Sequence, residues 1–227
     1  MSAASIRRIG VVIPARDEEE LIGRCLRSVV DSARAVRPRV TITVAADGCL
    51  DRTAQVARAF PGVNVIELEP SNVGAARAAA STRALRRGAD WLANTDADSI
   101  VPPQWLAEQL ALAAAGADVV VGTVRPDFAE LTKEQAAAWH ETHIPGEPNG
   151  HVHGANLGVR ASAYLAVGGY RGLPEHEDAD LVERLRGYTI VASDRGEVIT
   201  SARRFGRTPG GYARYLRESL LAAVPGE

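Results

Sequence analysis

Two aspartates separated by one alanine, Asp96 and Asp98, are the residues whose type and spacing point most directly to chemistry. They follow the apolar run WLANT at 91–95, which is typical of a buried strand, and alternate residues of an extended segment point to the same side. Mn²⁺ and Mg²⁺ prefer oxygen ligands and commonly join one or two carboxylates to substrate phosphates. The pair therefore predicts a Mn²⁺ or Mg²⁺ site, although the same spacing taken alone also fits a solvated loop or a helix cap.

Three further charged residues fit either a ligand contact or a structural role. Asp47 follows another strand-like run and could accept hydrogen bonds from a nucleotide base or organise a turn with Gly48. Glu18 could contact a ligand or act as a first-turn charge that suits the helix dipole. Arg77 lies in an alanine-rich helical segment and could meet a phosphate or pair with an acid. Taken singly, each of the three is better explained by its structural role.

Alternating strand and helix patterns fill the first half of the chain and must position these residues. Asp17, with Glu20 three residues on, resembles a capping arrangement for the first helix, and Asn72 is predicted to open an alanine-rich one. The alternation predicts an α/β fold with a mainly parallel sheet, in which ligands bind beyond the carboxyl ends of the strands. The segments 14–18, 47–48 and 96–98 all follow strands, so we expect them in one crevice. Strands are predicted at 9–14, 40–45, 63–68, 91–95 and 118–123.

Composition excludes several classes of protein. The 227 residues are 46% apolar and 24% charged with a net charge of −2, so no basic surface field suggests a nucleic-acid partner. The two cysteines, Cys25 and Cys49, lack metal-type spacing and fit a reducing compartment. No apolar segment is long enough to span a membrane. We therefore expect a cytoplasmic location, with peripheral contact at the inner membrane face left open, and the oligomeric state is left open as well.

Six segments together resemble family 2 glycosyltransferases, in the order found in that family. The resemblance implies one GT-A domain over residues 1–227, with a nucleotide-binding half to about residue 100 and an acceptor half and tail from about 101. This fold is a Rossmann-type, mixed but mainly parallel sheet flanked by helices. Two positions depart from the family pattern: Asp17 stands where asparagine is common, and Ala46 replaces the first aspartate of a pair. The segments are VVIPARDEEELIGRCLRSV, ADGCLDRTA, NVGAARAAA, TDADS, HGANLGVRASAYLAVGGY and EHEDADL.

The resemblance also implies roles for individual residues on the donor side. Pro14, Ala15 and Glu18 would line the nucleoside pocket. Asp47 would contact the base, and Arg77 would lie near the base or the diphosphate. These five residues come from the first three matching segments.

For the metal and acceptor side the resemblance implies a second set of roles. Asp96 would approach the ribose and the metal, and Asp98 would bind the metal. Asp178 would be the general base, although it could also cap the helix that follows. The sugar and acceptor side would be shaped by Gly154, Ala155 and Asn156.

These roles describe an inverting glycosyltransferase that uses a UDP- or GDP-sugar. A metal neutralises charge on the diphosphate leaving group, and a carboxylate takes the proton of the attacking acceptor hydroxyl. We expect a small-molecule or lipid-linked acceptor. A nucleotidyltransferase and a non-catalytic nucleotide-sugar-binding relative are the alternatives, although the acidic run Asp17–Glu20 is unlike the glycine-rich basic loop of a nucleotidyltransferase.

Two other groups of residues invite functional interpretations. His140 and His143 are spaced i and i+3 rather than the i and i+4 of a zinc hydrolase, and a zinc site from His151 and His153 has weak support. The tail SARRFGRTPGG contains three arginines that could close over a diphosphate or form a solvated loop. They are Arg203, Arg204 and Arg207.

Overall fold

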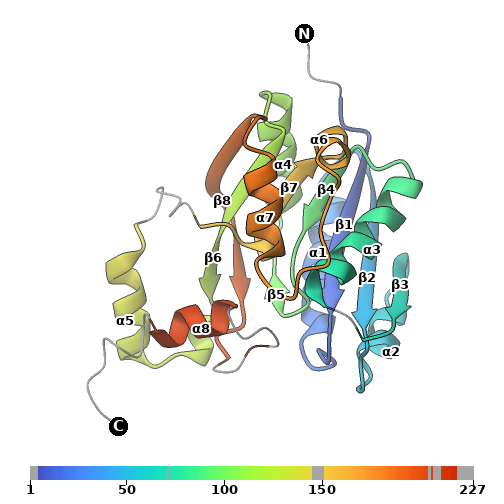
Figure 1. The fold of residues 1–227 in the computed structure, drawn as a ribbon. Coiled ribbons are helices and arrows are strands. Elements are labelled where there is room, and N and C mark those ends of the chain that lie inside the picture. The colour runs from blue at the N-terminus through green and yellow to red at the C-terminus, as the bar shows by residue number, and fades with distance from the viewer. Residues whose placement is uncertain (1–4, 71, 145–150, 204–205, 207–210, 219–227) are drawn as a thin grey trace.

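The computed structural model describes residues 5–70, 72–144, 151–203, 206 and 211–218, which build one sheet with helices on both faces (Figure 1). The described strands follow the order β3-β2-β1-β4-β7-β6-β8-β5. The strands are β1 Arg8–Ala15, β2 Arg39–Asp47, β3 Val63–Leu68, β4 Trp91–Asn94, β5 Ser99–Ile100, β6 Val119–Pro126, β7 Leu157–Arg160 and β8 Ile190–Thr200. The helices are α1 Ile22–Arg34, α2 Thr53–Arg58, α3 Val73–Arg86, α4 Trp105–Ala114, α5 Lys133–Thr142, α6 Ala161–Ala166, α7 Glu177–Arg184 and α8 Tyr212–Leu216, with 3₁₀ turns η1 Phe128–Glu130 and η2 Gly154–Asn156.

The four strands of the first half are parallel, as the alternation of patterns predicts. β1 pairs in parallel with β2 and β4, and β2 pairs in parallel with β3. The sheet then becomes mixed, because β7 runs antiparallel to both β4 and β6. The mixed, mainly parallel α/β architecture of the sequence analysis is thereby confirmed, and the carboxyl ends of β1, β2 and β4 lie at the same edge.

Apolar residues of β1 alternate between the two faces of the sheet. Ile9, Val11 and Ile13 face a core formed with α1, α2 and α4, whereas Val12 faces a core formed with α3, α6 and α7. Burial on both faces explains why this strand reads as a continuous apolar run. Helices on both sides hold its carboxyl end, and the loop after it, in a fixed position.

The starts of the first two long helices turn out differently from one another. Asn72 caps α3, accepting a hydrogen bond from the Ala75 backbone N–H at 2.9 Å, as predicted. The predicted capping arrangement at Asp17 and Glu20 is wrong, because α1 begins only at Ile22 and its N-cap residue offers no side-chain hydrogen bond. Asp17 instead adopts a left-handed conformation with φ of 52° and accepts the backbone N–H of Leu50 at 2.7 Å. It connects two loops rather than starting a helix.

A small third core lies beyond the end of the sheet. Trp139 of α5 and Leu216 of α8 are buried together with Ala202, and Phe128 packs against them. Figure 1 shows α5 and α8 side by side, away from the main layers. This arrangement brings α8 back toward the edge where the strands end. Within the described part of the chain, no helix combines the length and apolar character needed to cross a membrane.

Candidate active site

A cavity of about 670 Å³ lies at the carboxyl ends of β1, β2 and β4. Its volume is in the range of small-molecule sites. Three strand-end segments meet there, as the sequence analysis expects, together with residues around η2, the start of α7, the end of β8 and α8. The residues proposed from the sequence that line it are Pro14, Ala15, Glu18, Asp47, Arg77, Asp96, Asp98, Gly154, Ala155 and Asp178.

Asn156 is the one proposed site residue that does not line this cavity. Its side chain is buried, its Oδ1 accepts the indole N–H of Trp105 at 2.9 Å, and its Nδ2 donates to the carbonyls of Thr123 and Gly196, each at 2.9 Å. All of these partners belong to the protein core. Asn156 therefore fixes the turn that carries Gly154 and Ala155, and its amide does not face the cavity.

Glu18 and Asp98 form a buried acidic centre in the wall of the cavity. Arg203, from the segment after β8, lies between them. Arg203 Nη2 is 2.7 Å from Glu18 Oε1 and 2.9 Å from Asp98 Oδ2. Its Nη1 donates to Glu18 Oε2 at 3.0 Å. The guanidinium therefore joins carboxylates from the first loop and from the strand-end pair. The two other tail arginines, Arg204 and Arg207, lie outside the described residues.

Asp98 is held in an environment that disfavours its negative charge. Burial and the neighbouring Asp96 raise the pKa of Asp98 to about 6, while Arg203 acts in the opposite direction. Thr200 adds a hydrogen bond from Oγ1 to Asp98 Oδ1 at 3.3 Å. Pairing of β5 with β8 places this threonine beside the acidic pair.

The residues at this centre carry the oxygen ligands of a divalent cation, but among the described residues Glu18, Asp96 and Asp98 do not form a group of three ligand atoms within 4.8 Å of one another. Buried carboxylates that repel one another need a cation close by, and here Arg203 already supplies one between Glu18 and Asp98. Carboxylate oxygens are also the ligands that Mn²⁺ and Mg²⁺ prefer. The guanidinium thus marks where positive charge is stabilised.

Arg77 is a second buried cation, and it orients Asp96. Its side chain is only 2% exposed, Nη2 is 2.5 Å from Asp96 Oδ1, and Nε is 2.8 Å from Glu177 Oε1. Burial alone would lower the pKa of Arg77. The neighbouring acidic groups, Asp96 first and Glu177 among the others, have the larger effect and raise the pKa above its ordinary value. Both ion-pair partners of the guanidinium are protein carboxylates, so Arg77 positions Asp96. Glu177, which the sequence analysis does not include among the site residues, is the second carboxylate that Arg77 binds.

Asp178 lies in the first turn of α7 and faces the turn that carries Gly154. Its Oδ2 accepts the Gly154 backbone N–H at 2.5 Å. The N-cap position belongs to His176, which has a φ of 59°, so Asp178 is not the cap residue of the helix. Gly154 is required here, because a Cβ at this position would lie 2.4 Å from Arg77 Nη2. Close packing therefore holds the Asp178 carboxylate beside the cavity.

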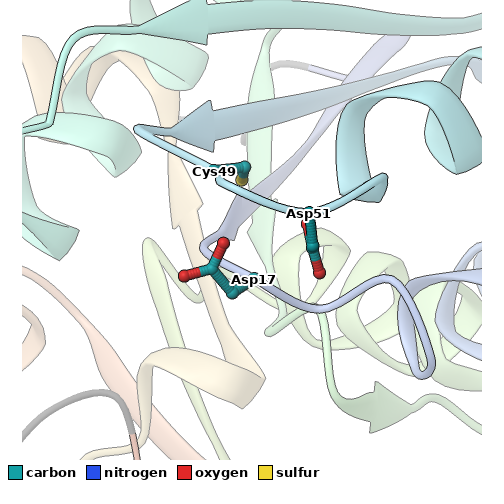
Figure 2. A group of neighbouring side chains, drawn as sticks. All are labelled: Asp17, Cys49 and Asp51. Atoms are coloured by element: carbon teal, nitrogen blue, oxygen red, sulfur yellow. The ribbon is translucent and has the colours of Figure 1, made fainter.

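A separate group of possible metal ligands connects the loops that follow β1 and β2 (Figure 2). Among the described residues, Asp17, Cys49 and Asp51 bring three ligand atoms within 4.8 Å of one another, a spacing that could hold a metal ion. Both carboxylates already accept backbone N–H groups, from Leu50 at 2.7 Å and from Glu19 at 2.9 Å. Burial also raises the pKa of the Cys49 thiol, and a metal-bound thiol must lose its proton. The group is best explained as a set of hydrogen bonds that joins the loop after β1 to the loop after β2.

Four of the five histidines fall into two groups. The His140 ring lies against Phe128, and the His143 ring stacks on Trp139 with 3.9 Å between centroids, so both pack around α5. His151 and His153 instead line the cavity. None of the four belongs to a group of three possible metal ligands in the described part of the chain.

The mixed sheet, with a cavity of acidic residues at the carboxyl ends of its strands, defines a protein of the GT-A class. The sequence profile described as Glycosyl transferase family 2 matches residues 10–165, and the chain belongs to that family. No sequence among curated proteins matches the chain.

Three solved structures with the same fold illustrate the range of sequence identity and structural similarity. S. aureus TarS 1-349 in complex with UDP-GlcNAc has a TM-score of 0.69 and 13% identity, covering 95% of this chain and 66% of that one. The mannosyltransferase PcManGT from Pyrobaculum calidifontis, in complex with GDP-Man and Mn²⁺, has a TM-score of 0.64 and 21% identity, covering 97% and 63%. A mycobacterial protein has a TM-score of 0.59 and 24% identity, covering 96% and 74%. The chain thus spans less than two thirds of the length of the TarS structures it matches.

Proposed function

We propose that this chain transfers a sugar from a nucleotide diphosphate to an acceptor hydroxyl, with inversion at the anomeric carbon. The observation that carries the proposal is the single cavity in which Asp47, the pair Asp96 and Asp98, and Asp178 meet. Similar structures bound to UDP-GlcNAc and to GDP-Man support a UDP- or GDP-sugar as donor. We propose one catalytic domain, with a nucleotide half to about residue 100.

The donor side follows from the residues after β1 and β2. Asp47 is buried at the end of β2, where its carboxylate can accept hydrogen bonds from a base. Pro14 and Ala15 end β1 and supply an apolar wall. Glu18 is buried in the loop that follows and lies beside the position of the diphosphate in this scheme.

Asp98 and Asp96 would hold Mn²⁺ or Mg²⁺, with Glu18 close by. When bound, the ion would neutralise the charge that develops on the leaving diphosphate. Asp98 faces the acidic centre directly, whereas Arg77 holds one oxygen of Asp96. The PcManGT complex contains Mn²⁺, which supports this use of the site.

Asp178 would remove the proton from the acceptor hydroxyl. Its Oδ2 accepts the Gly154 N–H, which fixes the orientation of the carboxylate beside the cavity. A single base and a single displacement give inversion. The acceptor in this proposal is a small molecule or a lipid-linked one.

A thermal-shift series with UDP, GDP and their sugars, each with and without Mn²⁺, tests the proposal. Stabilisation by one nucleotide that requires Mn²⁺ is expected, since a ligand that binds the folded state raises its melting temperature. Asp98→Ala should abolish the Mn²⁺-dependent stabilisation, and Asp178→Asn should keep nucleotide binding but lose transfer by about 10²-fold or more. Retained turnover in both variants would contradict the assignment.

A further inference from the structure

Four rings form a closed cluster on one wall of the cavity. His151 and His153 come from the segment before η2, and Tyr212 and Tyr215 come from α8. Neighbouring centroids lie 5.8 Å apart for His153 and Tyr212, 5.8 Å for Tyr212 and Tyr215, 5.9 Å for Tyr215 and His151, and 6.3 Å for His151 and His153. All four residues line the cavity. An aromatic wall is thus built by two segments distant in sequence.

His153 carries an unmet hydrogen-bonding capacity. Among the described residues its Nε2 has no hydrogen-bond partner, although the atom is buried. Burial lowers the pKa of His153 to about 4, despite the opposing effect of Asp178, so the ring is neutral at pH 7. A neutral imidazole has one donor and one acceptor nitrogen, and a hydroxyl group also both donates and accepts. The ring is therefore matched to a hydroxyl rather than to an anion.

The charges around the cluster also disfavour an anionic ligand. Asp178, Glu175 and Asp96 line the same cavity. The described arginines of the lining each face a carboxylate: Arg77 pairs with Asp96, and Arg203 pairs with Asp98. Arg16 Nη1 likewise lies 4.0 Å from Asp47 Oδ2. An acidic acceptor would meet carboxylates without a cation of its own.

We propose that this aromatic cluster is the acceptor subsite and that it takes a neutral pyranoside. A pyranose presents a face of C–H groups, which suits the negative face of an aromatic ring, and hydroxyls at its rim, which suit His153. The residue after His153 donates its N–H to Asp178, so a hydroxyl at this ring lies next to the proposed base. The assignment rests on the proposed function. The pyranoside can be a free glycoside or the terminal sugar of a glycolipid.

Saturation-transfer NMR with methyl glycosides tests the subsite in the absence of nucleotide. Methyl α-mannoside and methyl β-glucoside are the neutral probes, methyl β-glucuronide is the anionic one, and an octyl glucoside reports on a lipid tail. The neutral probes should bind, and the glucuronide should bind more weakly. Stronger binding of the glucuronide, or no saturation by any neutral probe, would overturn the proposal.

Variants assign the binding to the cluster. Tyr212→Leu and Tyr215→Leu should each weaken binding of the neutral probes about 2–10-fold, the effect of losing one ring contact. Tyr212→Phe and Tyr215→Phe keep the ring and should leave this binding unchanged. Tyr188→Leu is the matched control, because Tyr188 is 37% exposed and does not line the cavity. Equal binding by the Leu variants, with melting temperatures unchanged, would contradict the assignment.

A nucleotide readout separates this proposal from the proposed function. In His153→Gln, acceptor KM should rise while the nucleotide thermal shift stays unchanged. Nucleotide stabilisation without glycoside binding would reject the subsite and leave the transfer reaction standing. Glycoside binding that depends on Tyr212, without any nucleotide stabilisation, would reject the transfer reaction instead.

Discussion

Arg77 is a buried cation of the site that pairs with two carboxylates. It is one of the largest fully buried residues and reaches from α3 to carboxylates of two other segments, Asp96 and Glu177. Its Nη1 is buried without a partner among the described atoms. Such a group is stabilising only while both carboxylates stay in place, because a buried ion without its partner is costly.

Replacement of Arg77 by methionine should lower the free energy of unfolding by about 3–5 kcal/mol, since Asp96 and Glu177 would be left without their cation. Urea denaturation at pH 7 measures the change. Arg34→Met is the control: Arg34 and Asp31 pair at 3.0 Å but are 76% and 61% exposed, so its effect should stay below about 1 kcal/mol. Similar losses in the two variants would show that the buried pair has no special role.

Local sequence predicts the site residues that follow strands but not their partners. Asp47 and the pair Asp96 and Asp98 could be placed because the carboxyl ends of parallel strands share one edge of the sheet. The contact of Arg203 with Glu18 joins residues 185 positions apart, and no periodicity reports on it. Asn156 matched a motif, yet its role depends on Trp105, which only the fold brings near.

The packing of α3 on β1 depends on small residues on both elements. A Cβ at Gly10 would lie 2.4 Å from the Cβ of Ala84. The alanine-rich pattern of α3 predicts a helix, and its bounds, Val73–Arg86, agree with that prediction. The closeness of the contact is a property of the pair of elements. The helix brings Arg77 to the site, so this contact also sets the position of the buried cation.

Gly10→Ala should destabilise the protein by about 1–3 kcal/mol, since the added methyl group forces α3 away from the sheet. Gly172→Ala is the matched control, because nothing lies within 4 Å of a Cβ there. The double variant Gly10→Ala with Ala84→Gly should recover part of the loss, and thermal unfolding of these proteins, wild type and Ala84→Gly alone measures it. Additive losses in the double variant would contradict a direct clash.

The later strands show where patterns give too little information. β7 has four residues, LGVR, and β8 carries charged residues within IVASDRGEVIT, so neither matches the apolar runs of the first half. β7 is sandwiched between β4 and β6 and is defined by its neighbours. The mixed part of the sheet is therefore a tertiary property, whereas the parallel part follows from short-range alternation.

Across the whole molecule, burial of His153 links stability to pH. Its folded pKa of about 4 lies below the ordinary histidine pKa of 6.5, so the unfolded chain binds the proton more readily between these values. Stability from this group is complete above pH 6.5 and is lost as pH falls toward 4. Asp98 acts in the opposite sense, because its pKa is raised to about 6.

The contribution of His153 can be isolated with the His153→Gln variant in metal-free buffer. The stability difference between wild type and variant should shift against the wild type by up to about 3 kcal/mol as pH falls from 7 to 4. Urea denaturation along this series measures it. The effect of Asp98 is common to both proteins and drops out, so a difference that does not change with pH would show that His153 is solvated.

The contact between Arg203 and Glu18 has a consequence for the order in which the chain can fold. Glu18 and Asp98 are buried with the early strands, but the cation between them is supplied only near the end of the chain. A chain cut, or still being synthesised, before residue 203 would bury two carboxylates without their counter-ion. We therefore expect that the first half cannot be excised as a stable unit, and that the fold reaches its final stability only when the segment after β8 docks.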